Sequence, residues 1–170
     1  MKFSTITISL LIAASGAAFA EAPNDAQIAG IVVTANTVDI DAGKLAQKRS
    51  KNKQVRAFAK QMVTDHSGVN KQATALVKRL KVTPSDSDTS QSLKSGGDAN
   101  LANLKTLKGA AFDKAYVDNE VSYHQTVIDA LDNTLIPSAQ NAELKETLVN
   151  VRPAFVAHLE HAKHIQNTIK

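Results

Sequence analysis

The sequence predicts an all-α protein built as a four-helix bundle. Apolar residues recur at helical spacing in four long segments, and no segment alternates in the way that a half-buried strand does. Alanine, valine and leucine carry most of the hydrophobicity, whereas aromatic residues make up only 4% of the chain and tryptophan is absent. Such aliphatic side chains suit helices that pack closely on one another.

Residues 1–20 are typical of a secretory signal peptide. Lys2 is their only charged residue, an apolar run covers residues 6–14, and Ala18-Phe19-Ala20 provides the small-x-small cleavage pattern. The run is shorter than the roughly 20 residues that a bilayer span needs. We therefore expect cleavage after Ala20 and an exported single domain, residues 21–170, that is not transmembrane. Because cysteine is absent, this domain contains no disulfide and must be stabilised by its core.

The first two helices are expected at residues 24–49 and 52–80. The first begins at a cap near Asn24, and Asp39 lies on its otherwise apolar face at about 100° per residue. In the second helix, His66 lies inside the apolar stripe and Asp65 lies at its edge. Both helices thus carry polar groups where the pattern predicts the core.

A long connection is expected between the second and third helices, over about residues 82–108. It is rich in Ser, Thr, Asp and Gly and holds at most a short helix at 99–108. The third helix is expected at about 110–133 and the fourth at 141–168, after a break at Pro137 and Ser138. One long connection in the middle of four helices is typical of the ferritin-like arrangement.

Polar side chains at core positions cost several kcal/mol unless they are paired or bound. At a rise of 1.5 Å per residue, four such residues reach about the same level of the bundle. Glu120 and His124 share one face at i and i+4, and His158 falls at the border of the fourth apolar face. The inner layer consists of Asp39, His66, Glu120 and His124. A second, outer layer of polar residues consists of Asp65, Asp113 and His158.

Three separated segments resemble a known protein family. They are residues 55–67 (VRAFAKQMVTDHS), 109–117 (GAAFDKAYV, followed by His124) and 152–159 (RPAFVAHL). In this order they are similar to an exported bacterial domain of unknown function that is grouped with ferritin-like folds. Members of that family are often labelled outer-membrane proteins. The resemblance implies the fold and a periplasmic location, with outer-membrane association as a further expectation, and it implies no activity.

The inner layer is a candidate metal site. Imidazole and carboxylate ligands suit iron, manganese or zinc, and a chain with no cysteine and two methionines does not suit copper(I). Ferritin-like two-metal enzymes use Glu-x-x-His pairs, but Val121 stands three residues before His124, so we do not expect a two-metal oxidase. The inner layer could still hold one ion with water. The alternative is a hydrogen-bonded network that fixes helix register.

A cluster of basic residues surrounds the expected turn between the first two helices. Residues 42–64 contain seven basic side chains and no acidic one. The cluster indicates either an anionic surface as partner or a solvated helix end, and the lack of interleaved aromatic residues argues against nucleic acid. Its candidate residues are Lys48, Arg49, Lys51, Lys53 and Arg56. The sequence thus favours an exported, non-enzymatic envelope protein that binds a partner or an anionic surface. A role under stress is one option for such a protein. Metal binding or sequestration is the alternative.

Overall fold

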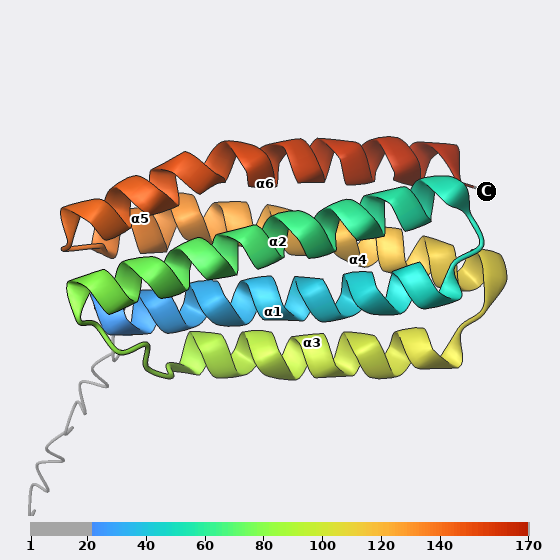
Figure 1. Cartoon of the computed structure of the whole chain (residues 1–170). Helices are drawn as coiled ribbons and strands as arrows, with labels where there is room; N and C mark the ends of the chain where they lie inside the picture. Colours follow the sequence, from blue (N-terminus) through green and yellow to red (C-terminus); the bar gives the residue numbers. More distant parts are fainter. Residues whose placement is uncertain (1–21, 170) are drawn as a thin grey trace, which may run out of the picture.

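The computed structural model describes residues 22–169, and nearly all of them are helical (Figure 1). The predicted all-α bundle is confirmed. The predicted signal peptide lies outside the described residues. No helix in the described part of the chain is long and apolar enough to cross a membrane. The long helices are α1 (Asp25–Arg49), α2 (Lys53–Leu80), α3 (Asp88–Thr106), α4 (Gly109–Ala130) and α6 (Ala142–Thr168).

Three of the four predicted core helices begin at asparagine caps. The Asn24 side-chain oxygen accepts a hydrogen bond from the backbone N–H of Gln27, and the backbone N–H of Asn24 donates one to the Gln27 side-chain oxygen. Asn52 caps α2 and Asn141 caps α6 in the same way, through their side-chain oxygens. These caps explain why the predicted starts of the helices agree with the structure.

The predicted connection between the second and third helices is wrong, because most of it forms the 19-residue helix α3. Ser87 and Ser90 make a reciprocal capping box that starts this helix despite its poor helix-forming composition. Gly97 lies so close to α1 that a Cβ atom there would stand 2.7 Å from both methyl groups of Val38. The glycine therefore allows α3 to pack closely along the outer side of α1 (Figure 1).

The third predicted helix continues further than expected. Beyond α4, residues Leu131–Leu135 form one π-helical turn (η1), and Ile136–Ser138 (α5) continue it to the connection with α6. Pro137 lies at the start of α5, directly after the π-helical turn. The turn into α6 therefore comes several residues later than the sequence pattern indicates.

The core consists of two apolar clusters. The first joins the N-terminal half of α1, the C-terminal halves of α2 and α4, and the N-terminal half of α6, and it includes Leu131 and Phe155. The second fills the other half of the bundle and includes Phe58, Met62 and Tyr116. Between the two lies a layer of buried polar side chains contributed by α1, α2, α4 and α6, namely Asn36, Asp39, His66, Glu120, His124 and His158.

Candidate metal centre

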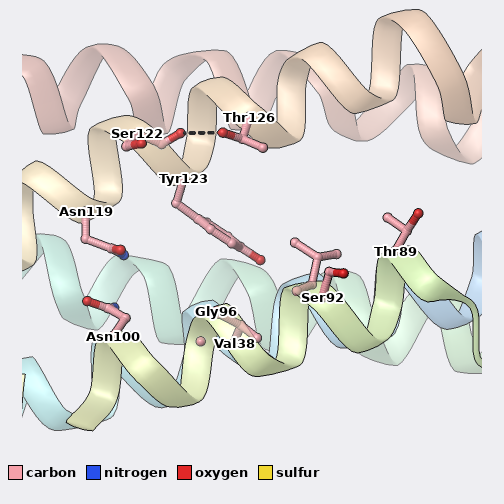
Figure 2. A pocket seen from close by; sticks show the side chains of 11 residues that line it. Val38, Thr89, Ser92, Gly96, Asn100, Asn119, Ser122, Tyr123 and Thr126 are labelled. Carbon is pink, nitrogen blue, oxygen red and sulfur yellow. Dashed lines mark hydrogen bonds between the residues drawn. The ribbon is translucent and has the colours of Figure 1, made fainter. Parts of the chain in front are cut away.

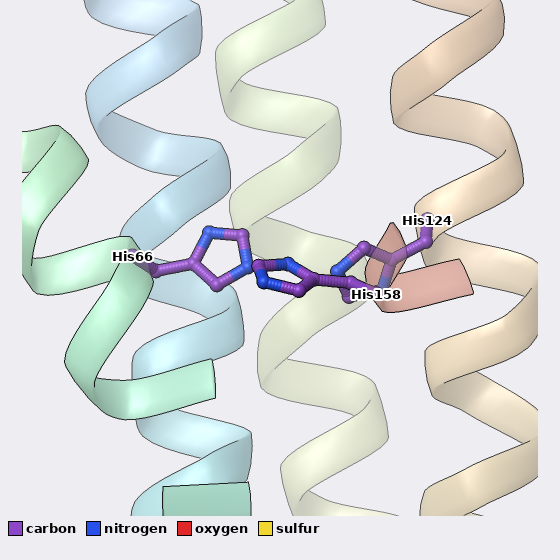
Figure 3. A group of neighbouring side chains, drawn as sticks. All are labelled: His66, His124 and His158. Atoms are coloured by element: carbon purple, nitrogen blue, oxygen red, sulfur yellow. The ribbon is translucent and has the colours of Figure 1, made fainter. Parts of the chain in front are cut away.

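Three imidazole rings from three helices meet in the polar layer. His66 comes from α2, His124 from α4 and His158 from α6, and their rings face one another in the middle of the bundle (Figure 3). Ring centroids lie 5.6 Å apart for His66 and His124, 5.2 Å for His66 and His158, and 5.4 Å for His124 and His158. One ring nitrogen from each residue lies within 4.8 Å of the others. All three residues are at most 3% exposed.

The His66 ring is oriented by Asn36 of α1. The Asn36 amide nitrogen donates to the carbonyl of Val32 at 2.8 Å, so its oxygen faces the ring. His66 Nδ1 lies 2.7 Å from this oxygen and must donate to it, because a carbonyl oxygen only accepts. The other nitrogen, Nε2, is buried and has no hydrogen-bond partner among the described residues.

The other two rings show the same arrangement. His124 Nδ1 donates to the backbone oxygen of Glu120 at 2.9 Å, and His158 Nε2 donates to Asp65 Oδ2 at 3.0 Å. His124 Nε2 and His158 Nδ1 are left buried without a hydrogen-bond partner in residues 22–169. Each of the three rings therefore donates one N–H to an acceptor beside the cluster and leaves its second nitrogen buried without a partner among the described residues.

Asp39 of α1 brings a carboxylate close to two of these rings. Its Oδ2 lies 2.9 Å from His66 Nε2 and 3.4 Å from His124 Nε2. Although these distances are short, neither Asp39 oxygen has a partner aligned for a hydrogen bond in the described structure. Burial would raise the pKa of the Asp39 carboxyl. The contact with His66 and the other nearby imidazoles outweighs this effect, so the pKa of Asp39 lies below its usual range. The carboxylate is therefore ionised and has unused acceptor positions.

Glu120 adds a second carboxyl group on the other side of His124. Asp39, Glu120 and His124 form a further group whose donor atoms lie within 4.8 Å of one another. Burial and the charge of Asp39 raise the pKa of Glu120 well above its usual value. Burial, together with both carboxylates, likewise raises the pKa of Tyr116, whose hydroxyl is buried in this region. The site thus holds one ionised carboxylate and one that favours its protonated form.

Two of the three imidazoles, His124 and His158, favour their neutral forms. Burial lowers the pKa of His124 to about 4, although the charge of Asp39 opposes this shift. Burial also lowers the pKa of His158, against the hydrogen bond from its ring to Asp65. At neutral pH these rings carry lone pairs, which is the form that coordinates metal ions.

The structure brings together the four residues of the predicted inner layer, Asp39, His66, Glu120 and His124, all at most 1% exposed. It corrects the predicted position of His158, whose ring belongs to the central cluster and not to an outer layer. The reason is the continuation of α4 through η1 and α5 to Ser138. His124 and His158 therefore lie about 15 and about 17 residues from the turn between them, at nearly the same level.

Asp65 contacts the cluster only through His158, and Asp113 is buried on α4 but belongs to neither donor group. Asn36 and Tyr116 are also buried at the site, although neither is a predicted site residue. Asn36 stands three residues before Asp39, and Tyr116 four residues before Glu120, so each lies on the same helix face as a predicted site residue. That spacing is the signal that could have identified them.

Most of the predicted basic cluster is exposed, with one exception. Arg49 donates to the backbone oxygens of Leu104 and Lys105 at 3.1 and 2.6 Å, so it ties α1 to the last turn of α3. Lys48, Lys51, Lys53 and Arg56 are exposed, and all of them lie near the turn between α1 and α2.

A surface groove of about 380 Å³ runs between α3 and α4, close to the cluster (Figure 2). Asn100 of α3 and Asn119 of α4 face one another across it, and Tyr123 projects from α4 toward α3 (Figure 2). The Tyr123 hydroxyl donates to the backbone oxygen of Ala35 at 2.8 Å, and its ring lies 6.1 Å from that of His124. Tyr123 therefore stands between the groove and the central histidines.

Two solved structures have the same fold. One, CopM in its Cu(II)-bound form, has a TM-score of 0.66 and 14% sequence identity, with 87% of this chain and 100% of that chain covered. The other is a DUF305 protein from Streptomyces coelicolor that is described as secreted. It has a TM-score of 0.68 and 13% identity, with 83% of this chain and 90% of that chain covered.

No curated protein sequence matches the chain. The model of one protein family, described as domain of unknown function (DUF4142), matches residues 12–165, which is most of the chain. The chain therefore belongs to the DUF4142 family.

Proposed function

We propose that the protein binds one transition-metal ion in the bundle core, through His66, His124, His158 and Asp39. The observation that carries this proposal is the orientation of the three rings. Each donates its outer N–H to an acceptor and leaves its inner nitrogen without a partner among the described residues. Histidines that coordinate metals characteristically donate their other ring N–H to a carboxylate or a backbone carbonyl.

The distances between donor atoms support coordination over direct pairing. With metal–ligand distances near 2.0 Å, two ligand atoms are separated by roughly 2.9 Å at right angles and roughly 3.3 Å in a tetrahedron. Asp39 Oδ2 lies 2.9 and 3.4 Å from the inner nitrogens of His66 and His124, without hydrogen-bond alignment. An ion between these atoms would satisfy donors that are otherwise buried and unused.

The burial of the donors favours storage or sequestration over turnover. Catalytic metal sites keep a coordination position open to substrate or water, whereas structural sites are closed by protein ligands. Here three imidazoles and the Asp39 carboxylate are all at most 3% exposed, and Glu120 stands beside them as a further oxygen donor. A non-enzymatic binding protein is consistent with this arrangement.

Among divalent ions, copper(II) is our first choice. A site rich in imidazole suits copper, zinc and iron, and in the general order of affinities copper(II) binds most tightly. The fold shared with a copper-bound protein supports this choice. Iron, manganese and zinc, which the sequence pattern suggested, remain alternative identities for the bound ion.

We also propose that the protein acts outside the cytoplasm, in the periplasm or at the envelope. The predicted signal peptide supports this location, and so does the fold shared with a protein described as secreted. An exported protein meets metal ions that the cytoplasm has not already buffered, which suits a sequestering role.

Metal titration of untagged protein tests the proposal. We expect one equivalent of copper(II) to bind to the parent chain by calorimetry and by elemental analysis after dialysis. Binding should weaken at least tenfold in His66→Gln and in His124→Gln. His164→Gln is the matched control, because His164 is exposed on α6 and lies outside both donor groups. Parent protein that binds none of the four metals would leave the polar layer as a network that fixes helix register.

A further inference from the structure

One end of the bundle carries a concentration of positive charge that the metal site does not explain. The turn between α1 and α2 and the turn between α3 and α4 both lie at this end (Figure 1). Arg49 links them directly, since it donates from the end of α1 to the backbone of Leu104 and Lys105. We call the exposed cations of these turns the cationic pole: Lys48, Lys51, Lys53, Arg56, Lys105 and Lys108.

The fold creates this pole by bringing together segments that lack acidic residues. Residues 42–64, 99–112 and 161–169 contain no Asp or Glu, and each of them reaches or approaches this end of the bundle. The carboxylate next in sequence after Lys108, Asp113, is buried and does not face solvent. None of the ion pairs formed within residues 22–169 involves a residue of the cationic pole. The charges are therefore not neutralised within the described protein.

The character of the pole indicates a diffuse anionic surface as its partner. Five of its six residues are lysines, which act as point charges toward phosphate, whereas bidentate recognition of a shaped ligand favours arginine. No aromatic side chain of the pole is available to stack on nucleic-acid bases. The one large hydrophobic side chain that is exposed in the described structure, Val149, lies on α6 about 19 residues before the end of that helix, roughly 28 Å from the pole along the helix axis. We therefore expect binding to be electrostatic, without insertion of apolar side chains into a bilayer.

We propose that the cationic pole docks the protein end-on to a membrane that contains anionic phospholipids. Clusters of four to eight basic residues bind such surfaces, and the attraction decays within a Debye length, about 8 Å at physiological salt. The bundle axis would then be roughly perpendicular to the membrane surface. Membrane docking does not depend on metal binding, because no residue of the pole belongs to the proposed metal site.

The test compares two triple variants of equal net charge. In the first, Lys51, Lys53 and Lys108 are changed to Glu. These positions lie at or just before the starts of α2 and α4, where an acidic residue interacts favourably with the helix dipole, so the variant should fold. In the matched control, Lys71, Lys78 and Lys145 are changed to Glu. They are exposed, and the nearest of them in α2 lies roughly 27 Å along the helix from Lys53.

Binding is measured by sedimentation of residues 21–170 with vesicles of phosphatidylcholine alone or with 30% phosphatidylglycerol added. We expect the parent and the control variant to sediment only with the anionic vesicles and to be released by 0.5 M NaCl. The Lys51, Lys53 and Lys108 variant should bind at least tenfold more weakly. Helicity by circular dichroism and metal content, measured on the same samples, show separately whether folding or the proposed metal site is affected.

Three results would overturn the proposal. Equal weakening in both triple variants would mean that net charge acts without a defined face. Parent protein that fails to sediment with anionic vesicles at low salt would exclude membrane docking. Retention by a single-stranded oligonucleotide without any vesicle binding would make the pole a nucleic-acid surface instead.

Discussion

The central polar layer and the apolar clusters on either side of it are equally buried, but they contribute differently to the stability of the fold. Phe58 and Met62 are fully buried among other apolar side chains, and this burial stabilises the fold directly. His66 and His124 are buried to the same degree one or two turns away, but their inner nitrogens have no partner among the described residues. The apolar clusters therefore account for stability, whereas the metal ion that we propose would explain why the polar layer is buried.

The largest expected effect tests the apolar side of this comparison. Phe58→Ala removes a fully buried ring that packs edge-on against Tyr116 at 6.3 Å. We expect a loss of about 3 to 5 kcal/mol in the free energy of unfolding. Urea denaturation should give the same loss with and without metal. A loss that depends on metal would show that the two regions are not energetically separate.

Metal binding tests the polar side. Copper(II) at about 100 times its dissociation constant should raise the unfolding free energy by about 2.7 kcal/mol, since it binds the folded chain. A chelator should reverse this gain, and His124→Gln should reduce it to about 1.4 kcal/mol or less while His164→Gln retains it. If Phe58→Ala reduced the gain by as much, the distinction between the regions would fail.

The pH dependence of metal-free protein provides a third test. Because burial holds the pKa of His124 at about 4 against an ordinary 6.5, the unfolded chain binds a proton between these values that the folded chain does not. Stability from this residue is thus complete above pH 6.5 and lost as pH falls to about 4. Between pH 7 and 4 the parent should lose about 2 kcal/mol more than His124→Gln, when both are measured with chelator present. Equal losses would mean that the His124 ring takes up a proton inside the fold.

The smallest expected effect concerns α3, which lies outside the four helices that hold the polar layer. Gly97→Ala places a Cβ atom 2.7 Å from two methyl groups of Val38, so α1 and α3 must separate slightly. We expect a loss of about 1 kcal/mol, within the range for overpacking, and unchanged metal affinity. Hydrogen exchange should show faster opening of α3 than of α4. A tenfold loss of metal affinity would show that α3 supports the site after all.

The sequence predicts the four core helices well because their stripes and asparagine caps are local signals. The helix over residues 88–106 was missed because its composition indicates a loop, whereas its stability comes from the Ser87 cap and the contact of Gly97 with Val38. Composition cannot reveal a contact between residues 59 positions apart in the chain. Tertiary packing outweighed local propensity here.

The candidate site was predicted in part for a similar reason. Asp39, His66, Glu120 and His124 stand out because each interrupts an apolar stripe. His158 was assigned to the wrong level because the π-helical turn at 131–135 is invisible in the pattern and moves the end of the helix. The orientation of each ring depends on partners such as Asn36 and Asp65, which only the folded structure brings into place.

Long-range proton–nitrogen NMR of the imidazole rings tests the central claim most directly, since it reports which nitrogen of each ring carries the proton. In metal-free protein at pH 7, the hydrogen bonds predict a proton on Nδ1 in His66 and His124 and on Nε2 in His158. One equivalent of a diamagnetic ion, zinc, should then shift the three inner nitrogens and leave His164 unchanged. Protons on the inner nitrogens, or rings that do not respond to the metal, would contradict the account.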